Sequence, residues 1–187
     1  MKVFAITGYS GSGKTTLVEK LIAHFVAAGL RVSALKHAHK GFDLDVPGKD
    51  STRMRAAGAS QVLVSGPKRW ALMQEVSQAF EPSLLEHLQR LAEVELVLVE
   101  GWKTSVLPKL EVHRSANNMV LRCSEDARIL GVSSDMPKEL AQQFMVKKLA
   151  LFHIDDVAAI AEFVLKNAQT IAQISVLETQ QQQQQQQ

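Results

Sequence analysis

The sequence predicts an α/β fold of three layers, in which helices cover both faces of a mostly parallel β-sheet. Three observations lead to this prediction. Short extended segments alternate with amphipathic helical ones, and the first strand runs through a glycine-rich loop into a helix. Residues 95–100 form a strongly apolar strand of the kind that is buried on both faces.

The first elements follow from their periodicity. Residues 3–6 have the composition of a short apolar strand. Behind the loop, apolar residues recur at three- and four-residue spacing over residues 17–26, which predicts a helix that ends near Gly29.

Later elements are predicted in the same way. Short apolar runs indicate strands at residues 31–37, 61–65, 70–74 as a short partner, 95–100, 129–133 and 149–153. Helical spacing indicates helices at residues 50–58, with Asp50 or Ser51 as N-cap, at 82–92, and in a C-terminal stretch that Asp155 caps. An added antiparallel hairpin is predicted from residues 109–112 and 119–122 across a turn at 115–118, and its free edge offers a place for two copies to pair.

The glycine-rich loop carries the strongest chemical signal. It reads Gly8-Tyr9-Ser10-Gly11-Ser12-Gly13-Lys14-Thr15 and matches G-x-x-x-x-G-K-[ST] at every fixed position, between the strand and the helix that this motif requires. Its glycines let backbone N–H groups converge on a phosphate, while lysine supplies charge and threonine offers a hydroxyl to Mg²⁺. We predict a P-loop NTPase fold whose nucleotide site comprises these residues and Thr16, with Lys14 also serving catalysis.

Glu100 ends the apolar strand and is followed by Gly101. Ligands of parallel sheets bind at the carboxyl ends of the strands, where P-loop proteins place the acidic residue that holds Mg²⁺. We expect Glu100 to join Thr15 as a metal ligand, directly or through water, or alternatively to orient the attacking water as a catalytic residue. The Gly101 backbone is expected to approach the γ-phosphate. The simpler alternative for Glu100 is a strand-end carboxylate that faces solvent.

A charged segment at residues 36–51 follows a predicted strand end and is too long for a simple connection. We expect it to line the same crevice and to contact a partner or substrate through Lys36, His37, His39, Asp43, Asp45, Lys49 and Asp50. A metal pair at His37 and His39 is disfavoured, because no third ligand stands at a fixed spacing. The two aspartates are expected either to support Mg²⁺ indirectly or to form a solvated acidic loop.

Composition narrows the class of protein. Residues 1–179 suit a single nucleotide-binding domain, and the glutamine tail at 180–187 is expected to be disordered. A formal net charge of +2 gives no indication of nucleic-acid binding, and the lone Cys123 excludes an internal disulfide. No apolar run approaches the ~20 residues of a membrane span, and the first residues lack a secretory signal, so we expect a cytoplasmic protein without membrane contact.

Several motifs form a distinctive combination. They are the P-loop, the block Lys36-His37-x-His39 running into Phe42-Asp43-x-Asp45-x-Pro47-Gly48-Lys49-Asp50-Ser51, then Arg55-x-x-Gly58-Ala59, Arg69-Trp70-Ala71-Leu72-Met73 and Leu98-Val99-Glu100-Gly101. Together they resemble the molybdopterin-guanine dinucleotide biosynthesis adapter proteins, the MobB family. The resemblance covers nearly all of residues 2–168. Lys40 departs from it, since relatives often carry a histidine there.

The resemblance implies a homodimeric GTP-binding protein with weak GTP hydrolysis. Such a protein assists the guanylyltransferase that joins GMP to molybdopterin, by delivering nucleotide or handling molybdopterin or its guanine dinucleotide. No Asn-Lys-x-Asp motif is present to read guanine. Asp135 follows the strand at 129–133, and its carboxylate is expected to accept from guanine N1 and N2. A turn residue before Pro137 is the alternative reading.

Two other classes of function stay open. A small-molecule or nucleoside kinase would use the same loop, with Arg53, Arg55, Lys68 and Arg69 clamping a phosphorylated acceptor. Against this, Arg114, Arg122 and Arg128 flank the predicted hairpin instead of forming one compact lid. A pure binding module, in which nucleotide fixes the conformation for a partner, is the third class.

Overall fold

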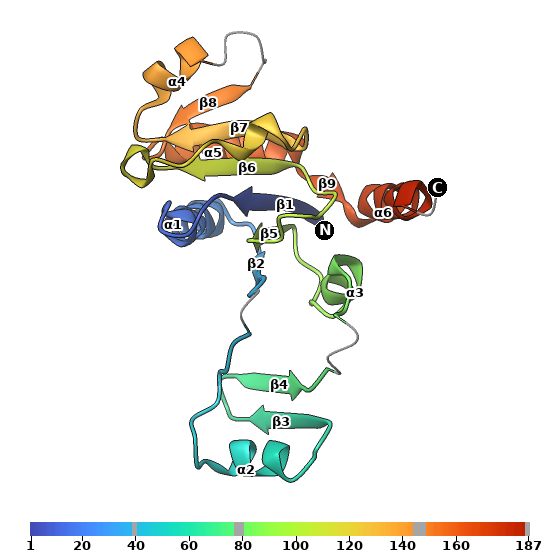
Figure 1. Cartoon of the computed structure of the whole chain (residues 1–187). Helices are drawn as coiled ribbons and strands as arrows, with labels where there is room; N and C mark the ends of the chain where they lie inside the picture. Colours follow the sequence, from blue (N-terminus) through green and yellow to red (C-terminus); the bar gives the residue numbers. More distant parts are fainter. Residues whose placement is uncertain (39–40, 77–80, 144–148, 186–187) are drawn as a thin grey trace. The chain divides into compact units, whose positions relative to one another are not determined.

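The structure, a computed structural model, describes residues 1–38, 41–76, 81–143 and 149–185 (Figure 1). The chain forms two compact units. The main unit comprises residues 1–37 and 84–187, and the inserted unit comprises residues 38–83. The sequence predicted one domain over residues 1–179, without setting the inserted unit apart.

The main unit is built on a seven-stranded sheet in the described part of the chain. Its order is β2 (Val32–Lys36), β5 (Leu96–Glu100), β1 (Lys2–Thr7), β6 (Lys109–His113), β7 (Ile129–Ser134) and β8 (Ala150–His153), all in parallel. The two-residue β9 (Gln169–Thr170) pairs with β1 in the antiparallel sense. The predicted mostly parallel α/β sheet is confirmed.

Helices cover both faces of this sheet. Helices α1 (Lys14–Ala27) and α5 (Val157–Asn167) pack on one face against Phe4 and Ile6, whereas α3 (Leu84–Gln89) and α6 (Ile171–Gln185) pack on the other against Val3 and Ala5. Successive side chains of a strand point to opposite faces, so alternate residues of β1 enter different cores. A short helix, α4 (Pro137–Gln143), precedes β8.

The hairpin predicted for residues 109–122 is wrong. Strand β6 lies inside the sheet, parallel to β1 and β7, and the chain continues through two 3₁₀ turns, η1 (Ser115–Asn117) and η2 (Arg122–Ser124). Residues 122 and 123 are held by the buried side chain of Glu111, which accepts hydrogen bonds from the backbone N–H groups of Arg122 and Cys123 at 2.9 Å each. This carboxylate caps η2, and the proposed pairing edge does not exist because β6 has neighbours on both sides.

Helix boundaries differ from the predictions by a few residues. Asp156, and not Asp155, caps α5 by accepting from the backbone N–H of Ala159 at 3.2 Å. Helix α2 (Asp50–Ala56) follows Lys49, which makes no side-chain cap, and α3 is shorter than the predicted 82–92. The helix α6 continues through Gln185, whereas the sequence alone predicted a disordered tail from residue 180. No helix in the described ranges is both long and apolar enough to cross a bilayer.

The inserted unit consists of α2 and a two-stranded antiparallel sheet of β3 (Gln61–Ser65) and β4 (Trp70–Gln74). The predicted pairing of these two strands is confirmed. The Arg55 guanidinium lies 2.6 Å from Glu75 and 3.0 Å from Asp43, with Asp45 at 3.6 Å. Hydrogen bonds to Glu75 and Asp43 raise the pKa of Arg55, and the charged side chain ties the loop before α2 to the end of β4.

Candidate functional site

The glycine-rich loop joins β1 to α1 and has the backbone that its glycines allow. Gly8, Gly11 and Gly13 have φ values of 140°, 75° and 95°, in a region that other residues rarely adopt. A Cβ on Gly8 would collide with the Val112 carbonyl oxygen of β6, whereas a Cβ on Gly11 would meet nothing within 4 Å. Close packing on the sheet therefore fixes Gly8, and conformation alone fixes Gly11.

Lys14 begins α1 and folds back over the loop, where its Nζ donates to the Tyr9 carbonyl at 2.6 Å. Partial burial lowers the pKa of this lysine, and the charges of Lys103, Lys36 and Arg122 lower it further, whereas Glu100 opposes them. Positive charge is thus concentrated at the mouth of the loop. Such a field favours an anion with several charges.

The Thr15 hydroxyl lies 3.0 and 3.1 Å from the two carboxylate oxygens of Glu100, although the residues are 85 positions apart in the chain. Glu100 is mostly buried at the carboxyl end of β5, next to β1 in the sheet. Lys36, at the end of β2, places its Nζ 3.4 Å from Glu100 Oε1. The pairing of three parallel strands brings together three residues that the sequence predicted separately.

Around Glu100 the backbone is tightly packed. Gly101 has a φ of 92°, and a Cβ there would lie 3.1 Å from the carbonyl oxygen of His37. The backbone N–H of His37 donates to the Glu100 carbonyl at 2.9 Å, and its ring stacks on Trp102 with centroids 4.5 Å apart. His37 therefore supports the strand end. His39 lies outside the described residues.

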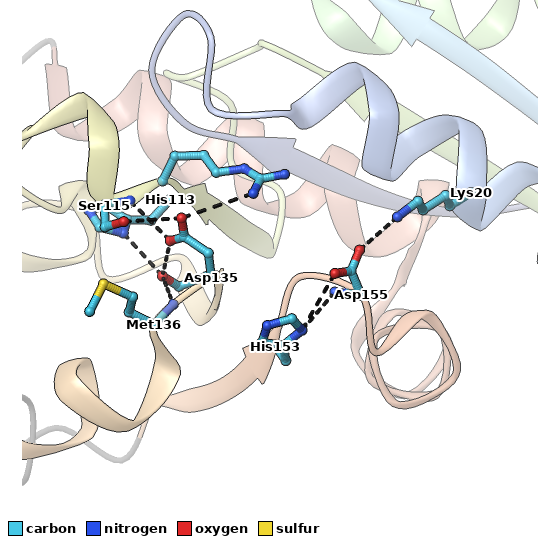
Figure 2. Close-up of polar contacts among 9 residues, drawn as sticks. Lys20, His113, Ser115, Asp135, Met136, His153 and Asp155 are labelled. Atoms are coloured by element: carbon cyan, nitrogen blue, oxygen red, sulfur yellow. Dashed lines mark hydrogen bonds and ion pairs between the residues drawn. The ribbon is translucent and has the colours of Figure 1, made fainter.

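Asp135 lies directly after β7 and is held from several sides (Figure 2). Its carboxylate accepts from the backbone N–H and the hydroxyl of Ser115 at 3.0 and 3.1 Å, and Ser134 lies at 3.3 Å. Burial acts to raise its pKa, but the hydrogen bonds from Ser115 and Ser134, together with one from its own backbone, outweigh that effect, so the pKa is lowered. The Arg114 guanidinium is 4.0 Å away. Asp135 is thus a fixed anion.

A small hollow lies directly beside the loop. It is lined by Gly13, Thr16, Leu17, Lys20, Arg114, Ile154 and Asp155. Figure 2 shows Lys20 and Asp155 facing each other, and their side chains form an ion pair of 2.8 Å. The hollow continues the surface of the loop past Gly13, on the side where Arg114 approaches Asp135.

A larger cavity of about 410 Å³ borders the same part of the main unit. Its walls are mostly apolar and come from the segment after β6 and from α4, with Met119, Val120, Leu121, Met136 and Leu140, together with polar groups of His113, Ser115 and Glu139. Ser115, which holds Asp135, is part of its lining. The cavity has the size and polarity of a small-molecule pocket.

The remaining predicted residues belong to the inserted unit or its approach. Asp43 and Asp45 bind Arg55, and Asp45 also accepts from the Ser51 hydroxyl at 2.6 Å, so both serve the local fold. Lys49 and Asp50 are exposed at the start of α2. Apolar side chains of the same segment, Phe42, Leu44 and Val46, are more than half exposed.

Sequence reasoning missed Lys103, whose charge acts on Lys14, and Arg122. The Arg122 guanidinium lies over the Tyr9 ring, with its carbon 4.4 Å from the centroid. Arg122 is distant in sequence and had been noted only as part of the wrongly predicted hairpin. No local pattern signals it, because its position depends on the capping of η2 by Glu111.

The parallel sheet and the loop define the class: a protein of the P-loop nucleotide-binding fold. The family model described as Molybdopterin guanine dinucleotide synthesis protein B, MobB, matches residues 3–135, and the chain belongs to the MobB family.

Relatives agree with this assignment. A Haemophilus influenzae protein named molybdopterin-guanine dinucleotide biosynthesis adapter protein is 39% identical over 165 residues, covering 87% of this chain and 86% of the relative. An Escherichia coli protein of the same name is 37% identical over 167 residues, covering 88% of this chain and 91% of the relative.

Solved structures are similar as well. A crystal structure of molybdopterin-guanine biosynthesis protein B has a TM-score of 0.66 at 26% identity, covering 88% of this chain and 98% of that one. Bacillus subtilis MobB shares the fold with a TM-score of 0.70 at 24% identity, covering 90% and 99%.

Proposed function

We propose that this protein is a GTP-binding adapter of molybdenum cofactor biosynthesis, which assists the guanylyltransferase that converts molybdopterin to its guanine dinucleotide. Family membership supports the pathway. One observation supports the nucleotide site most strongly. Lys14 folds over the P-loop, and the hydroxyl of the next residue, Thr15, lies 3.0 Å from the Glu100 carboxylate.

The same groups suit Mg²⁺, which prefers hard oxygen ligands. Thr15 and Glu100 would hold the ion, and it would neutralise charge on the β- and γ-phosphates when bound. The Lys36 ammonium, 3.4 Å from Glu100, balances the carboxylate in this structure. The donor set therefore fits a magnesium–triphosphate complex.

We further propose that intrinsic hydrolysis is weak. A base or water-positioning residue needs a free acceptor near the terminal phosphate. The carboxylate of Glu100 is already engaged by Thr15 and Lys36, which leaves it better suited to the metal than to a water molecule. The site would thus keep GTP bound for a partner.

For the base, we propose that Asp135, which follows β7, reads guanine beside the phosphate loop. Arg114 lies close to both Gly13 of that loop and Asp135. Guanine N1–H and N2–H would replace the donors that Ser115 and Ser134 now supply. An adenine presents an acceptor at N1 and would leave the carboxylate unpaired.

We propose that two copies associate through the inserted unit. On one face of its sheet, Leu63, Leu72 and Trp70 are 59%, 48% and 69% exposed. A two-stranded sheet also has two free edges, and so small a unit buries little apolar surface of its own. A second copy would cover the same patch symmetrically.

The exposed side chains of Phe42, Leu44 and Val46 form the surface that we assign to the guanylyltransferase.

A kinase is less well supported. Its acceptor clamp would need Arg55, whose guanidinium is occupied by Glu75 and Asp43.

The test is a calorimetric panel of GTP, GDP, XTP and ATP with Mg²⁺, repeated with molybdopterin guanylyltransferase. We expect GTP to bind best, turnover to stay slow, and the partner to form more dinucleotide when the protein is present. Asp135→Asn should shift the preference from GTP towards XTP, because xanthine has a carbonyl oxygen on C2, where guanine has its N2 amino group. Rapid phosphoryl transfer to a nucleoside would favour the kinase, and unchanged base preference in the variant would refute the role of Asp135.

A further inference from the structure

Arg122 lies beside the phosphate loop, and its side chain has hydrogen-bonding capacity that no described residue satisfies. Its guanidinium lies over the face of Tyr9, the second residue of the loop. Its Nε is buried and has no hydrogen-bond partner among the described residues. A cation–π contact leaves the N–H groups of a guanidinium unsatisfied, and a buried donor without an acceptor is costly. An acceptor from a ligand would remove that cost.

The backbone under this arginine is held in place. Glu111 on β6 accepts the N–H groups of Arg122 and Cys123, and β6 is paired with β1 through Thr7 and Glu111. The carboxylate is nearly inaccessible to solvent, which makes its two hydrogen bonds strong constraints. The root of the Arg122 side chain therefore keeps a fixed position relative to the loop that leaves β1.

The surrounding charge favours a polyanion. The positive charges of Arg122, Lys36 and Lys103 all act on Lys14, and Glu100 is the carboxylate that opposes them. Repulsion among these cations is relieved when phosphate oxygens enter between them. Arg122 offers a planar fork of donors, which matches two oxygens of one phosphate better than an ammonium does.

We propose that Arg122 is a phosphate-binding residue supplied in cis, which moves from the Tyr9 ring onto the terminal phosphate of the bound triphosphate. This inference rests on the proposed function and deepens it. The aromatic face holds the guanidinium close to the loop before the nucleotide arrives, so little side-chain entropy is lost on binding. Together with Lys14, the arginine would make the site sensitive to the third phosphate.

The test compares GTP, GDP and inorganic tripolyphosphate on three variants by titration calorimetry with Mg²⁺. For Arg122→Ala we expect GTP and tripolyphosphate to bind roughly 10- to 100-fold more weakly and GDP to change by less than about threefold. Arg122→Lys should recover part of the loss. Arg128→Ala removes the same charge from an exposed site of the neighbouring turn and should leave all three ligands unaffected.

Equal weakening of GTP and GDP by Arg122→Ala, with an unchanged unfolding midpoint, would overturn the inference, as would unchanged GTP binding. Arg122→Lys separates a folding defect from a lost contact, because it keeps the aliphatic stem and the charge. If the wild-type protein binds tripolyphosphate but does not prefer GTP, the proposed function fails while the role of Arg122 is still decided by tripolyphosphate.

Discussion

The main unit and the inserted unit differ in where their apolar side chains lie. In the main unit, Val3, Phe4 and Ile6 of β1 and Leu96 and Val99 of β5 are fully buried between helical layers. In the described part of the inserted unit, Val62 is the one buried hydrophobic residue, and the apolar face around Trp70 is exposed. The first unit thus has a core of its own, whereas the described part of the second buries little and is held by the ion pairs of Arg55.

The difference also separates two kinds of function. The groups to which we assign phosphate binding need a fixed geometry, and they lie in the main unit, where buried strands position them. Apolar residues on an exposed sheet are suited to association. We therefore expect changes that disturb the packing of the main unit to affect stability and nucleotide binding together, and changes on the exposed face of the inserted unit to affect association alone.

The largest effect is expected from Gly8→Ala. Its Cβ would overlap the Val112 carbonyl of β6, and its φ of 140° is unfavourable for alanine. We expect a loss of about 3 kcal/mol in the free energy of unfolding and no measurable GTP binding. Urea unfolding and titration calorimetry measure the two quantities.

The matched control is Gly11→Ala, in the same loop. Its Cβ would meet no atom within 4 Å, and only the φ of 75° is unfavourable. The expected cost is about 1 kcal/mol. If both variants lose the same stability, the packing of the loop on β6 is not what fixes Gly8.

A smaller effect on the fold, with a clear effect on association, is expected from Leu72→Glu. This residue lies opposite Leu63 on the exposed face of the inserted sheet. The dissociation constant of the proposed dimer should rise about 100-fold, because a desolvated carboxylate would face an apolar patch, while the stability of the monomer should change by less than about 0.5 kcal/mol. Analytical ultracentrifugation measures the first and thermal unfolding the second.

Lys68→Gln is the control for this prediction. It changes the charge by the same amount at an exposed position in the turn between β3 and β4. An unaltered dimer in Leu72→Glu would exclude this face as the interface. A dimer lost equally in Lys68→Gln would indicate a long-range effect of charge.

The sequence predicted the positions of residues correctly where they depend on a local motif or on the end of a strand. The P-loop is contiguous, and Glu100 was found because an apolar strand must end at the ligand-binding edge of a parallel sheet. The prediction of a hairpin at residues 109–122 was wrong because it rested on the turn-like composition around Ser115. The determining contact is tertiary: the buried Glu111 side chain accepts hydrogen bonds from the backbone of η2. Lys36 was expected at the same crevice because it lies at the end of a predicted strand, whereas Arg122 comes to the loop only through folding, and no spacing in the sequence brings it near Tyr9.

The most direct test of the central claim is the binding of Mg²⁺–GTP to Lys14→Ala, measured by calorimetry beside the exposed-site control Lys166→Ala. Lys14 lies at the loop and partly exposed, so its truncation should leave the unfolding midpoint unchanged. We expect the variant to lose at least about 100-fold in GTP affinity, since a charge-assisted contact to the phosphates is removed, and the control to bind like the wild type. Retention of wild-type affinity by folded Lys14→Ala would contradict the assignment of this loop as the nucleotide site.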